Sequence, residues 1–101
     1  MDIRELRYFL AVADEQNITK AAERLYISQP SLSKQMSNLE DEIGAPLFIR
    51  GGRKITLTES GILLKKRAEE LMDLYDKTRC ELMSHEREIS GTVYIGGGES
   101  R

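Results

Sequence analysis

The chain has 101 residues, of which 40% are hydrophobic and 32% are charged, and its formal net charge is −2. This composition is typical of a globular protein rather than a disordered one, and the length suits one domain or a domain with an appendage. The single cysteine excludes an internal disulfide framework and a zinc site built from several cysteines. No apolar run approaches the length of a membrane span and no signal-peptide pattern opens the chain, so we expect a cytoplasmic protein that does not enter a membrane.

Two helices are predicted in the N-terminal part of the chain, over residues 2–16 and 17–26. The first opens with Asp2, which is followed three residues later by a glutamate and so resembles the start of a capping box. Apolar residues then recur at helical spacing. The second helix is short and can be capped by Asn17 or Thr19. Its two adjacent alanines would let another helix cross it closely.

Residues 29–43 predict a third helix whose N-terminus is rich in hydroxyl groups. Ser28 suits the N-cap, and Pro30 falls in the first turn, where a missing N–H costs nothing. Gly44 is a natural residue at the C-terminal end of the helix. The apolar positions of this helix lie within a narrow arc and are expected to face the core: Leu32, Met36, Leu39 and Ile43.

Residues 46–58 predict a β-hairpin, because two short β-prone pieces flank a pair of glycines. Arg50 and Arg53 would lie at the tip of this hairpin. Between Thr19 and Lys54 the chain carries six cations against four acids, three of which are consecutive. A local basic surface is therefore expected despite the negative net charge, and a polyanion responds to such a surface more than to the global sum.

A long helical segment is predicted from Thr58 to about Ser90. Its apolar positions alternate by four and three residues, which is the pattern of a coiled-coil seam. The seam consists of Leu64, Ala68, Leu71, Tyr75, Thr78, Leu82, His85 and Ile89. Because one small domain cannot bury so long a seam, we expect a homodimer through this helix. For His85, the chain's single histidine, packing is favoured over the alternatives of metal binding and catalysis.

Two short helices with a tight turn between them form a helix-turn-helix over about residues 18–37. The second helix of such a unit enters the DNA major groove by its N-terminal end. Gln29 can pair bidentately with adenine, and Lys34 can reach guanine or phosphate, while arginines in the hairpin suit a narrow minor groove. Lys20 and Arg24 also fit the alternative of surface cations spaced i, i+4. The predicted DNA-binding residues are Thr19, Lys20, Arg24, Ser28, Gln29, Pro30, Ser31, Ser33, Lys34, Ser37, Arg50 and Arg53.

Residues 21–61 carry a set of residue types at fixed spacings. They are the double alanine, Ser28-Gln29, Ser33, Gln35, Leu39-Glu40, Gly44, Leu47-Phe48, Arg50, Arg53, Leu57-Thr58 and Gly61. This pattern closely resembles the N-terminal domain of the LysR-type transcriptional regulators. The resemblance implies a dimeric winged helix with antiparallel linker helices. It also implies contacts to bases or nearby phosphates from Gln29, Pro30, Ser33 and Lys34, and wing contacts from Arg50 and Arg53.

The resemblance further implies a sensor domain for a small-molecule effector after the linker helix. Residues 91–101 begin like a β-strand and look like the start of that domain, the remainder of which this chain lacks. A dimer would supply the two recognition helices that an inverted-repeat site in double-stranded DNA requires.

We therefore expect a mainly α fold. It comprises a winged helix-turn-helix DNA-binding domain over residues 1–58, a linker and dimerisation helix over 59–90, and the start of an effector-binding domain over 91–101. The expected function is sequence-specific regulation of transcription, and a winged helix used for protein contacts is the alternative. No nucleophile–base pair, phosphate loop or metal-ligand cluster stands out in the sequence, so we expect neither catalysis nor a cofactor or metal.

Overall fold

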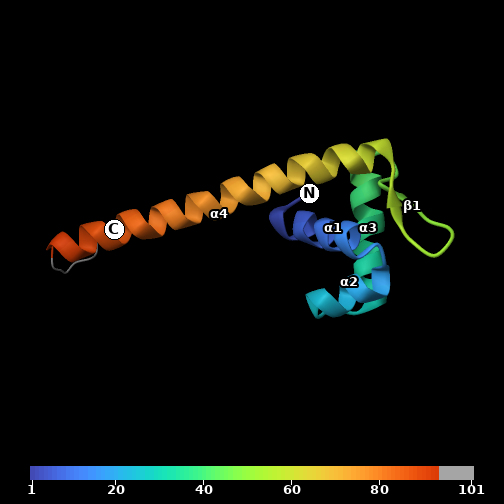
Figure 1. Cartoon of the computed structure of the whole chain (residues 1–101), viewed down its shortest axis with the longest axis horizontal. Helices are drawn as coiled ribbons and strands as arrows, with labels where there is room; N and C mark the ends of the chain where they lie inside the picture. The colour runs from blue at the N-terminus through green and yellow to red at the C-terminus, as the bar shows by residue number, and fades with distance from the viewer. Residues whose placement is uncertain (94–101) are drawn as a thin grey trace. The chain divides into compact units, whose positions relative to one another are not determined.

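The computed structural model describes the backbone of residues 1–93 and the side chains of residues 1–85. The chain forms two compact units, which divide after Glu70. Figure 1 labels the helices and the first strand, and its colours follow the chain from the N-terminus to the C-terminus. The elements are α1 (Ile3–Glu15), α2 (Ile18–Leu25), α3 (Gln29–Ile43), β1 (Phe48–Ile49), β2 (Thr56–Leu57) and α4 (Glu59–Val93). The prediction of a mainly α fold with a two-stranded wing is confirmed.

The first three helices begin at side chains that accept backbone N–H groups. Asp2 and Glu5 form the expected capping box, in which the Glu5 N–H donates to Asp2 Oδ1 over 2.8 Å. Asn17, rather than Thr19, caps α2, since its Oδ1 accepts the N–H of the third helical residue. Ser28 caps α3 as predicted. Each cap satisfies an N–H group that no helical carbonyl can reach, so the caps fix where the helices start.

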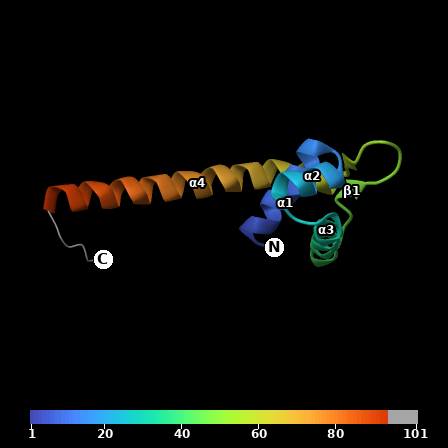
Figure 2. The same cartoon turned by 90° about the horizontal axis from the view of Figure 1, so that it is seen from below.

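The core lies where α1, α2, α3 and the wing meet, and Figure 2 shows α3 nearly end-on within this unit. The buried cluster comprises Phe9, Ala11, Val12, Ala21, Ala22, Leu32, Met36, Leu39, Leu47 and Phe48. The two alanines are almost completely buried, which agrees with the close helix crossing expected there. The expectation that Ile43 faces the core is wrong, because its side chain is 39% exposed at the last residue of α3.

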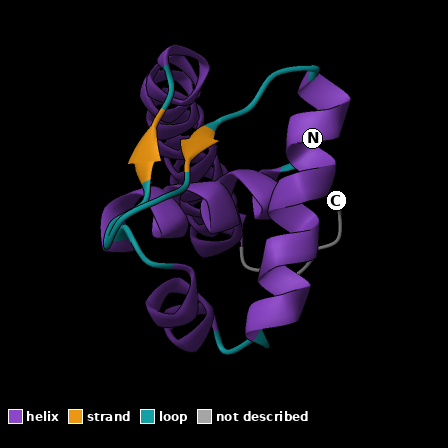
Figure 3. Cartoon of the chain, turned by 90° about the vertical axis from the view of Figure 1, so that its right-hand side faces the viewer, coloured by secondary structure: helices purple, strands orange, loops and turns teal. Residues whose placement is uncertain are grey.

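The predicted hairpin is confirmed as a wing of two antiparallel strands (Figure 3). Phe48 pairs with Leu57 and Ile49 pairs with Thr56. The loop between the strands spans residues 50–55, so it is longer than a two-residue turn. Its two glycines have φ values of 147° and 76°, a region that side chains disfavour and glycine adopts freely.

The first turn of α4 is fixed against the segment that leads into the wing. The Thr58 hydroxyl donates to the Pro46 carbonyl over 2.7 Å and accepts the N–H of Gly61 over 3.0 Å. A Cβ atom at Gly61 would collide with the Leu47 carbonyl oxygen, so only glycine allows this close approach. The wing and the start of α4 are thereby held to one another.

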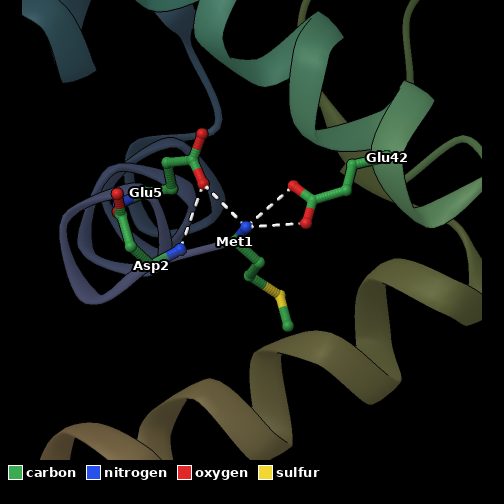
Figure 4. A network of polar contacts seen from close by, with 4 residues as sticks. All are labelled: Met1, Asp2, Glu5 and Glu42. Atoms are coloured by element: carbon green, nitrogen blue, oxygen red, sulfur yellow. Dashed lines mark hydrogen bonds and ion pairs between the residues drawn. The ribbon is translucent and has the colours of Figure 1, made fainter.

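The N-terminal ammonium group of Met1 ties the start of α1 to the end of α3 (Figure 4). It donates to both carboxylate oxygens of Glu42, over 2.8 and 2.7 Å, and lies 3.3 Å from the carboxylate of Glu5. The hydrogen bonds to Glu42, and to a smaller extent those to Glu5, raise the pKa of this amino group above its ordinary value of 8.0, although desolvation opposes the shift.

The predicted seam on α4 is only partly available to a partner. Ala68 is completely buried, and Leu64 packs partly against the core, so both residues serve this chain's own fold. The core of the unit thus extends along the first turns of the helix, and a place for these two residues in a dimer seam stays a prediction. Leu71, Tyr75 and Leu82 are 43%, 40% and 63% exposed. Other seam members, Thr78 and His85, are also exposed, and the side chain of Ile89 lies outside the described residues.

The end of α4 differs from the sequence-based expectation. Residues 91–93 complete the helix and do not begin a strand. A strand needs a neighbour for its backbone groups, and the two described strands pair with each other, whereas a helix satisfies its own. The remaining residues of the proposed effector-binding segment, 94–101, lie outside the described part of the chain. Among the described residues, no helix combines the length and the apolar character that crossing a bilayer would need.

Candidate nucleic-acid interface

The exposed face of α3 combines hydrogen-bonding groups with a rigid support. On the opposite face, Leu32, Met36 and Leu39 are completely buried in the core. The exposed residues are Gln29, Pro30, Ser31, Lys34 and Ser37, preceded by the exposed cap Ser28, and Ser33 is half-buried. The structure thus brings all the residues predicted on this helix to one solvent-facing surface. We call the solvent-facing side chains between Ser28 and Ser37 the reading face.

Two polar residues of the reading face are joined to one another. Gln29 Nε2 donates to Ser33 Oγ over 3.0 Å, one turn further along α3. Lys34 is the cation of this surface, and within the described residues its side chain has no ion-pair partner. The acids Glu40 and Glu42 engage the wing and the N-terminus, at the C-terminal end of the helix. The reading face therefore carries no carboxylate of its own.

The residues predicted on α2 divide into free and engaged groups. Thr19 and Lys20 are exposed, and no hydrogen bond or ion pair to the Lys20 ammonium is found among the described side chains. Arg24 lies 3.3 Å from the carboxylate of Glu15 and 3.6 Å from that of Asp14, both near the end of α1. Lys20 can thus bind an anion directly, whereas Arg24 would first have to give up its carboxylate partners.

The two wing arginines also differ. Arg50 lies 3.4 Å from the Glu40 carboxylate, and its guanidinium stands over the Phe48 ring at 5.8 Å from the ring centroid. Arg53 is exposed in the loop and, in the part of the chain that the structure describes, pairs with no acid. Figure 2 shows this loop reaching outward from the strands. Of the two predicted wing contacts, only Arg53 presents a free guanidinium.

Sequence reasoning missed the role of Glu40 and the position of Lys54. Glu40 Oε2 accepts the N–H groups of Leu47 and Phe48 over 2.7 and 3.3 Å, so it holds the entry to the wing against α3. The signal was its place directly after Leu39, at the edge of the buried face. Lys54 is exposed beside Arg53 and likewise has no carboxylate partner among the described residues, so it belongs with the cations of the wing loop.

Within residues 1–85, whose side chains the structure describes, no group of three or more histidine, cysteine, aspartate or glutamate side chains could hold a metal ion. His85 and Cys80 are both exposed on α4. The arrangement of the first unit instead presents donors and acceptors on a helix beside a cationic loop, which is what a nucleic-acid surface requires.

Comparison with characterised proteins gives relatives that are transcriptional regulators. HTH-type transcriptional regulator BsdA of Bacillus subtilis (strain 168) is 44% identical over 97 residues, which are 95% of this chain and 33% of that protein. HTH-type transcriptional regulator BenM of Acinetobacter baylyi is 46% identical over 96 residues, covering 95% of this chain and 31% of BenM. The chain therefore spans about a third of the length of these two relatives.

Solved structures of other proteins share the fold of this chain. A crystal structure of the BenM_DBD complex with benA site 1 DNA superposes with a TM-score of 0.81 at 42% identity, covering 83% of this chain and 98% of that one. The CbnR_DBD–DNA complex gives a TM-score of 0.79 at 35% identity, with 84% and 98% of the two chains covered. The family described as "Bacterial regulatory helix-turn-helix protein, lysR family" matches residues 3–62. The chain therefore belongs to the lysR family of bacterial regulatory helix-turn-helix proteins.

Proposed function

We propose that this chain is the DNA-binding part of a transcription regulator, with the reading face in the major groove and the wing loop in the adjacent minor groove. The observation that carries the proposal is the pairing of an acid-free, hydrogen-bonding helix face with a neighbouring loop of unpaired cations. Hydrogen-bonding side chains read base edges, and cations neutralise phosphates. Such a regulator would act in the cytoplasm, where bacterial DNA lies.

The predicted contacts fall into three groups under this proposal. The base-reading group is Ser28, Gln29, Pro30, Ser31, Ser33 and Ser37. The phosphate or minor-groove group is Thr19, Lys20, Lys34, Arg53 and the added Lys54. Arg24 and Arg50 form the third group, because each is already paired with a carboxylate and would contribute less. Free cations gain more from a phosphate than cations that must first exchange an existing partner.

Salt dependence tests the electrostatic part of the proposal. Each neutralised phosphate contributes roughly −0.9 to the slope of log K against log salt concentration. Four cations of the proposed surface pair with no carboxylate among the described residues: Lys20, Lys34, Arg53 and Lys54. If each neutralises one phosphate, the slope is about −3 to −4 for each chain. The measurement is fluorescence-anisotropy titration of a random duplex from low to moderate salt. A flat response would exclude DNA as the partner and would favour a winged helix that binds protein.

We further propose that the protein is a homodimer through the part of α4 beyond residue 70. Large apolar side chains are exposed there: Leu71, Leu74, Tyr75, Leu82 and Met83. A solvated helix has little reason to carry so many, and a partner helix would bury them. The dimer would place two reading faces on an inverted repeat, while any small-molecule effector would bind elsewhere in a longer protein.

The dimer is tested by placing a charge in the exposed apolar stripe. Leu71→Asp would bury an unpaired carboxylate, so we expect the dimer to dissociate and specific DNA binding to fall with it. Ser84→Asp is the matched control, since it adds the same carboxylate to the same helix, nearly opposite Leu71 and Leu82 around the helix axis, and should leave the dimer intact. Sedimentation velocity at micromolar concentration distinguishes the two. A monomeric wild type, or a dimeric Leu71→Asp protein, would rule out this stripe as the interface.

A further inference from the structure

The hydrogen bond between Gln29 and Ser33 couples two side chains that would otherwise contact DNA independently. Gln29 is the first residue of α3, so no preceding helical turn holds its side chain. Ser33 lies one turn later, is half-buried, and directly follows the completely buried Leu32. Residues four apart lie on the same helix face, which lets the more rigid serine hold the more mobile glutamine.

The bond also determines which groups Gln29 has left to offer. A glutamine amide has two N–H donors and one carbonyl acceptor. Ser33 Oγ takes one of the N–H donors over 3.0 Å. One donor and one acceptor remain, and together they match the N7 acceptor and N6 donor of adenine. Guanine presents two acceptors on the same edge, N7 and O6, and would face the amide oxygen with one of them.

We infer that Ser33 is a positioning residue, which orients the Gln29 amide so that it prefers adenine over guanine. This inference rests on the proposed DNA-binding function. The ordering of a flexible side chain is completed before DNA arrives, so less conformational freedom is lost on binding. The Ser33 hydroxyl serves Gln29 as the acceptor of this hydrogen bond, so its effect on base preference passes through the Gln29 amide.

The experiment is selection of bound duplexes from a library with randomised base pairs, followed by sequencing, with the 101-residue chain and its variants. The adenine-over-guanine ratio is read at the position whose preference Gln29→Ala changes. A lost bidentate contact corresponds to a fall of roughly 5- to 150-fold in that ratio for Gln29→Ala. Loss of the orienting hydrogen bond in Ser33→Ala should lower it by about 3- to 10-fold. Ser33→Thr keeps a hydroxyl and should restore the ratio.

Asn38→Ala is the control, since it removes an exposed polar side chain from α3 outside the reading face and does not touch the Gln29 amide. It should leave the ratio unchanged. The double variant Gln29→Ala/Ser33→Ala should have the same ratio as Gln29→Ala alone, because a positioning residue has no effect once its target is gone. Because alanine has a high helix propensity, these variants should remain folded, and far-UV circular dichroism measures whether they do.

Three outcomes would overturn the inference. The first is an unchanged adenine-over-guanine ratio in Ser33→Ala. The second is an additional loss in the double variant, which would make Ser33 an independent base contact. The third is a wild type that selects sequences without any adenine preference attributable to Gln29. A wild type that binds no duplex at all would instead overturn the proposed function itself, so the two failures are distinguishable.

Discussion

The reading face and the wing loop present different chemical groups on different supports. On α3, an amide and several hydroxyls stand on a helix whose opposite face buries Leu32, Met36 and Leu39 completely. In the wing, Arg53 and Lys54 stand on a six-residue loop with two glycines in unusual backbone conformations, between strands of two residues each. One region is rich in directional hydrogen-bonding groups, and the other is rich in charge.

This difference matches the geometric demands of reading base edges and of attracting phosphates, the two tasks that the proposed function requires. A bidentate hydrogen bond to a base edge tolerates only small displacements, so the side chain needs a fixed backbone. Attraction between a cation and a phosphate depends on distance and only weakly on direction, so a flexible loop can supply it. Under the proposed function, α3 would specify the base sequence and the wing loop would attract the DNA backbone.

The largest expected effect follows from removing a buried side chain that supports the reading face. Leu32→Ala deletes a completely buried side chain beneath the reading face. It should lower the free energy of unfolding by about 2–5 kcal/mol, through lost burial and the cavity that remains. Urea denaturation followed by circular dichroism measures the change. Ile43→Ala at the half-exposed end of the same helix should cost less than half as much, and equal losses would show that α3 is not anchored as described.

The second prediction concerns affinity and compares the two wing arginines. Arg53→Ala should remove about one unit from the salt-dependence slope, weaken binding to all duplexes similarly, and leave stability unchanged within about 0.5 kcal/mol. Arg50→Ala should change the slope less but lower stability by about 0.5–1 kcal/mol, because it breaks the pair with Glu40. Anisotropy titrations and urea denaturation separate the two effects. The reverse pattern would mean that Arg50 is the DNA contact.

The smallest expected effect lies at the other end of α3, where Glu42 accepts the N-terminal ammonium group. The pKa of that group is raised in the folded protein, chiefly by its hydrogen bonds to Glu42. Its contribution to stability is therefore fully present below the ordinary pKa of 8.0 and is lost as pH rises through the raised value. Unfolding measured from neutral to alkaline pH should show this loss in the wild type and less of it in Glu42→Gln. Identical pH profiles would contradict the contact.

The sequence predicted the features that depend on near neighbours in the chain. Caps at Asp2 and Ser28, the buried stripe of α3 and the pairing of the wing strands follow from spacing over a few residues. Features that depend on distant residues were not visible. Arg50 pairs with Glu40, ten residues earlier in the chain, and Ala68 is completely buried in the folded chain. Periodicity alone could not show that the same core already covers the first seam positions.

The same limit applies to the candidate site. Residue types identified the reading face, because hydroxyls and an amide at the start of a predicted helix can be recognised in the sequence. Which cations are free could not be predicted, since Arg24 and Arg50 find their acids only in the folded chain. The i, i+4 spacing of Gln29 and Ser33 made a hydrogen bond between them predictable, but only the structure shows which of the two donates.

The most direct test of the division between a specifying helix and an attracting loop is an amide chemical-shift map. The ¹⁵N-labelled chain is titrated with a duplex recovered from the randomised library and, separately, with a random duplex. We expect both duplexes to shift the amides of residues 51–54, and only the selected duplex to produce large shifts over residues 28–37. Equal shifts of both regions with both duplexes would contradict the account, as would shifts confined to the exposed apolar residues Ile43 and Leu63.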